Sequence, residues 1–199
     1  MGAMSGTAIA IIVVGVLVLA VGIWLVMTYN RLIQRRNRVD NAWAQIDVQL
    51  KRRRDLVPNL VQTVQGYASH ESSTFEAVTR ARAASAAATT PAQAAQAEGM
   101  LGQALGRLFA VAEAYPALKA DAGFRDLQAQ LAETENRITV SRQVYNDTVL
   151  TYQNTIQTFP NVLVAGPFGF TGREYFEVGD EAERSVPEVR FNRPPSPDA

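Results

Sequence analysis

The hydrophobic pattern begins with an unbroken apolar run and then changes to a helical stripe. Residues 8–27 are twenty apolar or small residues, and no charged side chain occurs between positions 2 and 30. A helix of that length crosses a hydrocarbon core of about 30 Å. Trp24 and Tyr29 stand where interfacial aromatic residues are enriched. The pattern predicts a transmembrane helix that starts near Ala8, ends near Met27 and includes Trp24.

Two alternatives for this run are a cleaved signal peptide and a buried helix of a soluble protein. A signal peptide has a basic n-region, a shorter apolar run and a small-x-small cleavage site, and residues 26–29 (VMTY) make a poor site. A buried soluble helix is disfavoured because no face of this run is polar. We therefore expect a retained anchor.

Four arginines directly follow the run, and no basic residue precedes it. By the positive-inside bias the bulk of the chain is predicted to be cytoplasmic, with the N-terminus outside. These juxtamembrane side chains are also placed to meet anionic headgroups. They are Arg31, Arg35, Arg36 and Arg38.

From Arg31 onward, apolar residues recur in steps of seven, four, three and four, which is one helical stripe. The stripe consists of Leu32, Val39, Trp43, Ile46 and Leu50. The helix is expected to continue straight from the apolar run. At residues 55–58 we predict a turn, because Asp55 can cap a new helix and Pro58 suits a first turn. A kinked continuous helix is the alternative.

Three further helices are predicted. The second shows Leu60, Val64, Tyr67, Glu71, Phe75 and Val78 and fades near Thr90. The third starts at Pro91 and shows Leu101, Leu105, Leu108, Val111 or Ala112, and Tyr115; its Gly102 and Gly106 are expected to allow close helix contact. The fourth starts at Asp121 or Gly123, ends at Pro160, and shows Phe124, Leu127, Leu131, Thr134 or Glu135, Ile138, Tyr145, Val149, Tyr152, Ile156 and Phe159.

These stripes predict an all-α fold in which a transmembrane helix continues into an antiparallel four-helix bundle with an irregular apolar C-terminal segment. The expected division is an anchor (1–30), a bundle (31–160), an apolar irregular segment (161–178) and a disordered tail (179–199). Helix parity then places the connection at residues 89–91 and the segment after Phe159 at the membrane-proximal end.

The apolar C-terminal segment mixes Gly and Pro with aromatic residues. We expect it to touch the bilayer surface or a neighbouring subunit. Capping of the open bundle end by Val162, Leu163, Phe168 and Phe170 is an equal alternative. The candidate contact residues are Phe159, Phe168, Phe170, Tyr175 and Phe176.

Net charge is zero but unevenly distributed. Residues 31–54 hold eight basic and two acidic residues, which leaves +6 there and −6 in the rest. The second basic group is a candidate patch for an anionic partner, at the end of the bundle far from the membrane. A solvated turn whose cations pair with Asp55 or another subunit is favoured, and no nucleic acid is expected. The group is Lys51, Arg52, Arg53 and Arg54.

The residues that carry chemistry are scarce. Cysteine is absent and His70 is the one histidine. His70-Glu71 begins like a zincin helix, but position 74 is Thr. No Glu has a His three residues later, as a di-metal bundle would need. We therefore predict no catalytic, cofactor or metal site. A polar layer is expected among Thr134, Asn136, Asn146 and Asn154, beside the fourth stripe.

Several unusual strings occur in a fixed order: residues 41–43 (NAW), 49–59 (QLKRRRDLVPN), 66–71 (GYASHE), 113–120 (EAYPALKA), 135–138 (ENRI), 145–147 (YND) and 169–176 (GFTGREYF). In these the chain resembles the LemA family over nearly its whole length. The resemblance implies a bacterial protein with an N-terminal membrane helix and a helical bundle. It implies no assigned enzymatic activity; relatives are linked to the envelope, to HtpX-type membrane proteases and, in one branch, to magnetosome formation.

Together these features predict a single-pass protein of the bacterial inner membrane, in contact with lipid. It is expected to be a non-catalytic scaffold or adaptor that forms a homo-oligomer. A regulatory partner subunit of an HtpX-like protease or another membrane protein is the alternative. An enzyme or metal carrier in the bundle core is a third and weaker hypothesis.

Overall fold

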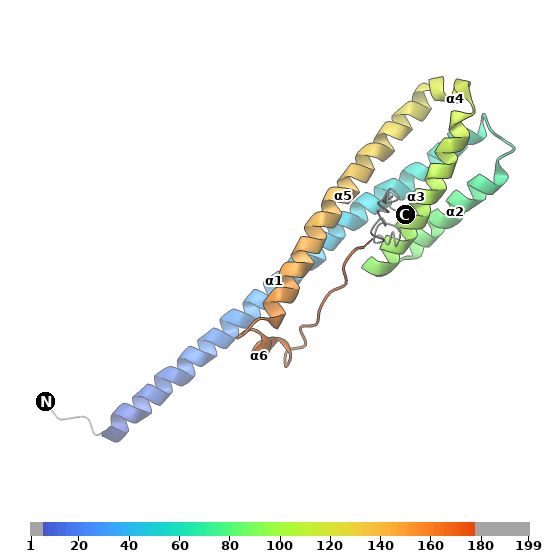
Figure 1. Cartoon of the computed structure of the whole chain (residues 1–199). Helices are drawn as coiled ribbons and strands as arrows, with labels where there is room; N and C mark the ends of the chain where they lie inside the picture. The colour runs from blue at the N-terminus through green and yellow to red at the C-terminus, as the bar shows by residue number, and fades with distance from the viewer. Residues whose placement is uncertain (1–5, 178–199) are drawn as a thin grey trace, which may run out of the picture.

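The computed structural model describes residues 6–177, and this range contains helices and no strand (Figure 1). The predicted all-α class is confirmed, and so is the long apolar N-terminal helix. The predicted tail at 179–199, with residue 178, lies outside the described residues. The helices are α1 (Gly6–Gln65), α2 (Ser72–Ala87), α3 (Pro91–Glu113), α4 (Pro116–Ala120), α5 (Ala122–Gln157) and α6 (Val162–Ala165).

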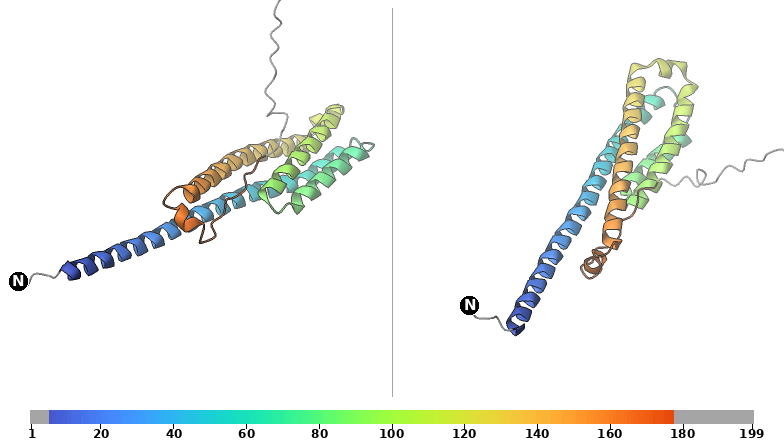
Figure 2. Two further views of the ribbon diagram at one scale, coloured as in Figure 1. Left: turned by 60° about the horizontal axis from the view of Figure 1, so that its bottom comes forward. Right: turned by 60° about the vertical axis from the view of Figure 1, so that its left-hand side comes forward.

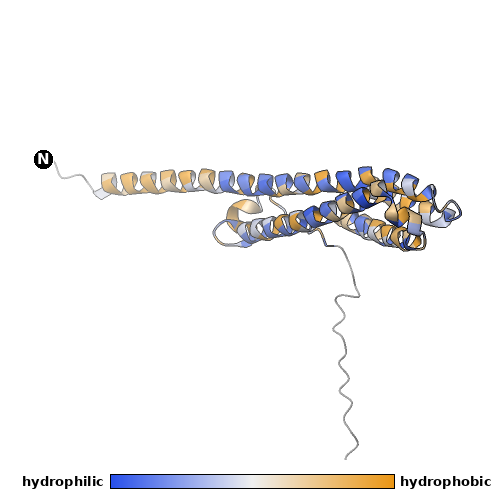
Figure 3. Ribbon diagram, turned by 90° about the horizontal axis from the view of Figure 1, so that it is seen from above, coloured by the Kyte–Doolittle hydropathy of each residue, from blue (hydrophilic) through white to orange (hydrophobic). Residues whose placement is uncertain are grey.

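Helix α1 is the axis of the molecule. Its 60 residues correspond to a length of about 90 Å. Its N-terminal part projects beyond all other helices (Figure 2) and is apolar on every visible side (Figure 3). Within the described residues it is the one helix long and apolar enough to cross a membrane. Ala8 and Trp24 are half-buried and Met27 is exposed.

The turn predicted at residues 55–58 is wrong, because α1 passes through it with Pro58 in its interior. The continuous helix, which was the alternative, is what the structure shows. The apolar stripe explains the continuation, since Val57, Leu60 and Val64 are all buried in the same core cluster. The chain turns only after Gln65, so the second helix begins at Ser72 and has 16 residues.

Two pairs of helices make up the part beyond the span. Helix α5 contacts α1 most extensively, and α2 contacts α3 (Figures 1 and 2). Trp43 of α1 packs on Tyr145 of α5, and Arg52, farther along α1, pairs with Glu133, which comes before Tyr145 in α5. The fourth predicted stripe is buried from Phe124 to Ile156 except for the half-buried Leu127, with Thr134 filling the gap, whereas Phe159 is exposed.

The buried residues form two clusters along the rod. The first lies between the middle of α1, the start of α3, α5 and the C-terminal segment and includes Leu32, Ile46 and Tyr152. The second lies between the end of α1, α2, α3 and the start of α5 and includes Leu60, Phe75 and Leu108. The α2–α3 pair therefore covers α1 only in the part that lies far from its N-terminus.

The connection at residues 89–91 is not at the membrane-proximal end. Thr89, Thr90 and Pro91 line a surface cavity together with Val39 and Trp43. Val39 lies ten residues beyond Tyr29, about 15 Å along α1. The reason is length, because α2 begins late and its 16 residues cannot return as far as the 36 residues of α5.

Candidate functional site: the membrane-proximal tip and a buried charge cluster

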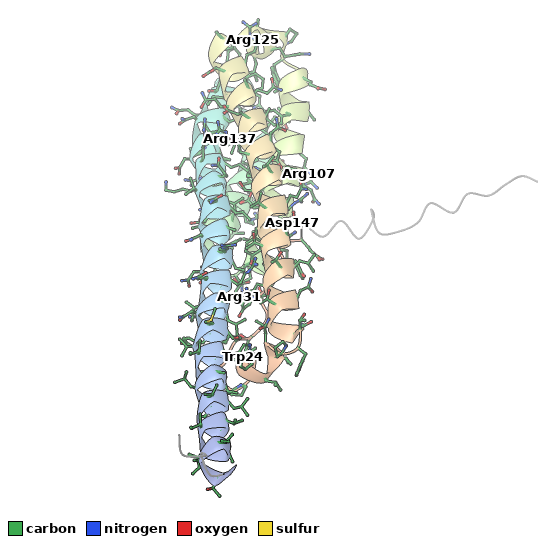
Figure 4. All side chains as sticks on the ribbon, turned by 90° about the vertical axis from the view of Figure 1, so that its left-hand side faces the viewer. Trp24, Arg31, Arg107, Arg125, Arg137 and Asp147 are labelled. Atoms are coloured by element: carbon green, nitrogen blue, oxygen red, sulfur yellow. The ribbon has the colours of Figure 1, made fainter. Side chains whose placement is uncertain are left out.

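The segment after α5 folds against α1 where the apolar run ends. Helix α5 ends at Gln157, and α6 follows after a turn. The ring of Tyr29 lies edge-on to Phe168 and Phe170, with centroid distances of 5.3 and 5.7 Å. Figure 4 shows Trp24 at the height of the turn after α5, with Arg31 farther from the N-terminus. The turn and the end of the span therefore form one packed unit.

Burial divides the five predicted contact residues. Phe170 and Phe176 are core residues, 6% and 0% exposed, whereas Phe159 and Phe168 are 74% and 59% exposed. Tyr175 is half-buried, and its hydroxyl donates to Gln153 Oε1 over 3.2 Å. Of the four residues that the capping alternative names, Phe170 is buried, as are its neighbours Val164 and Ala165, and the other three are exposed. Those are Val162, Leu163 and Phe168.

An extended stretch, residues 170–177, then runs back along α1 and α5. Side chains of α5 bind its backbone: the Tyr145 hydroxyl donates to Glu174 O (2.7 Å), and the Tyr152 hydroxyl donates to Thr171 O (3.0 Å). Asn146 binds Phe176 twice, donating from Nδ2 to its carbonyl and accepting its N–H at Oδ1. These hydrogen bonds from side chains of α5 hold the backbone of residues 170–177 against the helix, as strand pairing would do in a sheet.

The predicted polar layer is therefore partly present. Asn146 holds the C-terminal stretch, and Thr134 is fully buried with its hydroxyl donating to Gln130 O. Asn136 and Asn154 are exposed. Burial raises the pKa of Tyr145 to about 12 and raises the pKa of Tyr152 above its usual value. Both hydroxyls therefore stay protonated donors at neutral pH.

The second basic group is paired within the chain. Lys51 meets Asp55 at 2.6 Å, and its hydrogen bond holds the pKa of that carboxyl below its usual value. Arg52 lies 3.8 Å from Glu133, and Arg54 lies 3.6 Å from Asp47. Because α1 is continuous, these cations lie along a helix and not at a turn.

Arg53 is different because it is buried, at 8% exposed. Its guanidinium binds Glu98 at 2.9 Å and Glu135 at 3.2 Å. The Ser85 hydroxyl donates to the other oxygen of Glu98, and Glu98 and Ser85 are 4% and 2% exposed. Four helices thus meet at one charged cluster, defined as Ser85, Glu98, Arg53 and Glu135.

This cluster is not among the features predicted from the sequence. Its signal was present, because Glu98 lies four residues after Ala94 and three before Leu101, on the apolar face of α3. A lone carboxylate on such a face needs a buried cation, and Arg53 is the residue that supplies it. Within residues 6–177 no group of three potential metal ligands gathers.

An open groove lies between α3 and α5 beside this cluster. Its volume is about 410 Å³, and Leu105, Phe109 and Leu131 contribute apolar walls. Gly102 and Gly106 also line it, so they do not bring two helices into close contact as predicted. A Cβ built at Gly106 has no neighbouring atom within 4 Å in the described part of the chain.

Known proteins with similar sequences agree with the family resemblance that the sequence strings and the helical architecture indicate. The chain is 29% identical to magnetosome proteins MamQ 1 and MamQ 2 of Paramagnetospirillum magneticum, over 84% of this chain and 72% of each relative. It is 26% identical to magnetosome protein MamQ of Magnetospirillum gryphiswaldense, over 76% of this chain and 65% of that protein. The LemA family model matches residues 42–191. This match covers the domain beyond the span, and the chain belongs to the LemA family.

Proposed function

We propose that this protein is a single-span, membrane-anchored scaffold of the bacterial inner membrane that self-assembles into a homo-oligomer and catalyses no reaction. The N-terminus lies outside and the helical domain in the cytoplasm. The observation that carries the proposal is the continuity of α1. Its apolar part and its core residues, from Leu32 to Val64, belong to one unbroken helix. A rigid connection of this kind fixes the orientation of the domain relative to the bilayer, which a scaffold needs.

In this proposal α1, α2, α3 and α5 act as an antiparallel four-helix bundle. Side chains support it by tying the α2–α3 pair to α1: Arg53 binds Glu98 of α3, and Arg54 Nη1 lies 3.4 Å from Ser85 Oγ of α2. From the relatives named as magnetosome proteins we carry over a role at a membrane and no more. Because the cations of residues 51–54 pair with carboxylates of the same chain, we favour a role in holding the domain together over the binding of an anionic partner.

Self-assembly is expected to use apolar side chains that the domain leaves on its outer surface. Val140 and Val144 lie one turn apart on α5 and are 62% and 48% exposed. Val48 of α1 is 62% exposed. Trp43 packs on Tyr145 and Arg52 pairs with Glu133, so Val48 and Val140, which lie between these pairs, are at similar heights on the rod, and Val144 is one turn from Val140. These valines are the residues we would substitute to weaken a contact between copies.

The test is the mass of the full-length protein in lipid nanodiscs, corrected for bound lipid. We expect one discrete multimer, and we expect a V140K/V144K double variant to dissociate. A matched control places the same two lysines at Gln62 and Ser69, which are exposed at the far end of the rod. The control should keep the mass of the unchanged protein.

A monomer at every concentration would contradict self-assembly. It would favour the second candidate function, regulation of another membrane protein such as an HtpX-like protease, which the open apolar groove between α3 and α5 supports. That candidate predicts a changed rate of peptide cleavage when the purified protease and this protein share a vesicle.

A further inference from the structure

We propose that the exposed apolar tip of the C-terminal segment, defined as Phe159, Val162, Leu163 and Phe168, inserts into the interface of the same bilayer that α1 spans. This second membrane contact rests on the proposed anchor. It makes the domain touch the membrane at two places, the span and the tip. Two contacts fix both the height and the tilt of the rod, which one helix alone does not.

The height of the tip follows from its contacts with α1. Tyr29, which packs on Phe168, comes two residues after Met27 at the end of the apolar run. Trp24 packs against the core cluster that includes Val164 and Ala165 of α6. Figure 4 places Trp24 level with the turn after α5. Once residues 8–27 occupy the hydrocarbon core, the tip must lie at the headgroup level on the same side.

The burial pattern of the segment shows that it does more than cap the bundle. Its inward side chains, Val164, Ala165 and Phe170, are at most 6% exposed. Its outward side chains are also apolar, with exposed fractions of 74% for Phe159 and 61% for Leu163. A cap that faced water would carry polar residues on its outer side. Apolar residues on both sides are typical of a segment packed against protein on one side and lipid on the other.

Charge is distributed as an interfacial segment requires. No charged residue occurs between Asp147 and Arg173, so the end of α5 and the whole tip are uncharged. On the neighbouring helix, Arg31 lies farther from the N-terminus than Trp24 (Figure 4), and Arg35 follows one turn later in the sequence, where lipid phosphates are expected. Arg36 is held over the ring of Phe170, 5.5 Å from its centroid. An uncharged apolar tip next to the arginines of α1 is the arrangement that suits an anionic bilayer surface.

The backbone of the tip is also prepared for a less polar environment. Phe168 N–H donates to Val164 O, Gly169 N–H to Gly166 O, and Phe170 N–H to Ala165 O. Gly169 has a φ of 70°, a conformation that glycine adopts without strain, and this lets the last of these bonds close the turn. Backbone groups that are paired within the segment need no water, so the segment can enter the interface without losing hydrogen bonds.

The chain contains no cysteine, so single labels can be placed without background. We would attach an environment-sensitive NBD fluorophore to L163C and, separately, F168C in the full-length protein. The variants would be reconstituted in vesicles of phosphatidylcholine with a minority of phosphatidylglycerol. Quenching would be measured as lipids with brominated acyl chains replace the ordinary ones. V16C, in the middle of the span, is the positive control. Q62C, at an exposed position at the far end of the rod, is the negative control.

We expect labels at 163 and 168 to emit at shorter wavelength than the label at 62. We also expect them to lose intensity with brominated lipid, though less than the label at 16. If they emit as in water while the label at 16 is quenched, the tip proposal is overturned and the anchor stands. If the label at 16 also escapes quenching, the anchor fails as well.

A short emission wavelength at 163 without lipid quenching would mean that protein covers the tip. Loss of that shift in nanodiscs holding one copy would identify a second copy as the cover. This result would also overturn the proposal. Because both labelled positions are exposed, unchanged circular dichroism is expected for each variant and serves as the folding control.

Discussion

Arg82 donates a hydrogen bond from its Nε to the backbone carbonyl of Arg54, over 2.8 Å. Four residues beyond Arg54 stands Pro58, which has no N–H and so leaves this carbonyl without its helical donor. Helix α2 therefore supplies from outside the bond that α1 lacks. This contact explains how α1 keeps its course through a residue that usually ends or kinks a helix.

Replacing Arg82 should weaken the fold because the carbonyl of Arg54 loses its donor. For R82M we expect a loss of about 1–3 kcal/mol in the free energy of unfolding, the usual cost of an unpaired, partly buried polar group. Denaturant unfolding followed by circular dichroism measures it. R80M, at an exposed arginine on the same helix, is the matched control and should change stability by about 0.5 kcal/mol or less.

The assignment to Pro58 can be separated from other effects of losing Arg82. In a P58A background the helix regains its own N–H, so R82M should cost clearly less than in the unchanged protein. Equal costs in both backgrounds would show that Arg82 acts through something other than this carbonyl.

Much of the fold followed from the sequence because stripes at helical spacing are local. Stripe residues such as Leu32, Leu105 and Ile138 are buried as predicted. Asp121 caps α5 by accepting the N–H of Phe124, and Thr90 caps α3 through Gln93 N–H. These features need only neighbours within a turn or two.

The errors came from partners distant in sequence. The course of α1 through Pro58 depends on Arg82, and the buried Arg53 depends on Glu98, 45 residues later. Neither pairing leaves a periodic signal. The exposure of Phe159 and the burial of Phe176 were not separable either, because both were candidate contact residues and the hydrogen bonds that hold Phe176 come from Asn146, 30 residues earlier.

Breaking the buried charge cluster should cost more than breaking a surface pair. For E98L we expect a loss of about 3–5 kcal/mol, because Arg53 keeps its charge in a buried place. The half-exposed Glu135 remains beside it and moves the value toward the lower end. E133Q, which removes an exposed partner of Arg52 and Arg137, is the comparison and should cost far less than E98L.

A triple variant distinguishes an unpaired charge from lost packing. R53M/S85A/E98L removes the cation, the hydroxyl and the carboxylate together, and it should recover most of the stability that E98L loses. If the triple variant is as unstable as E98L, the cluster acts through shape and not through charge. Thermal unfolding in detergent gives the ranking of the variants.

Stability should fall in alkaline solution because of Tyr145. Its pKa is about 12 in the folded chain and about 10 when unfolded, so the unfolded state releases the proton first. The contribution is complete below about pH 10 and is lost as the pH rises to about 12. Tyr152, whose pKa is also raised, adds to the fall.

Y145F isolates this contribution, since phenylalanine fills the same volume and cannot ionise. The difference in unfolding free energy between the unchanged protein and Y145F should be constant below about pH 10 and should shrink above it. Spectrophotometric titration of tyrosinate should lose its most alkaline step in Y145F. With Y67F, at an exposed tyrosine, that step should remain. A constant difference up to about pH 12 would contradict the burial of this hydroxyl.

The C-terminal aromatic residues should separate into two classes in detergent. Phe176 is fully buried between Trp43 and Asn146, so F176A should cost about 3–5 kcal/mol. F159S alters a side chain that is 74% exposed and should cost about 0.5 kcal/mol or less. Thermal unfolding measures both. Equal costs would mean that the tip belongs to the core.

Gly106 offers the opposite kind of change, a gain in stability. It lies inside α3, and a Cβ placed there meets open space in the described part of the chain. Glycine in a helix interior is about 1 kcal/mol less favourable than alanine, so G106A should raise the free energy of unfolding by about that amount. At Gly102 the added Cβ would lie 3.5 Å from Arg53 Nη2, an ordinary contact, so a smaller gain is expected.

The same substitution tests whether another copy uses the groove between α3 and α5. If self-assembly uses the outer valines, G106A should raise thermal stability and leave the mass in nanodiscs unchanged. If a helix of another copy packs on Gly106, the added methyl group would hold that helix away and weaken the contact. On dilution, the multimer of the variant would then dissociate at a higher protein concentration than that of the unchanged protein. A stabilised domain with weakened assembly would therefore move the subunit contact from the valines to the groove.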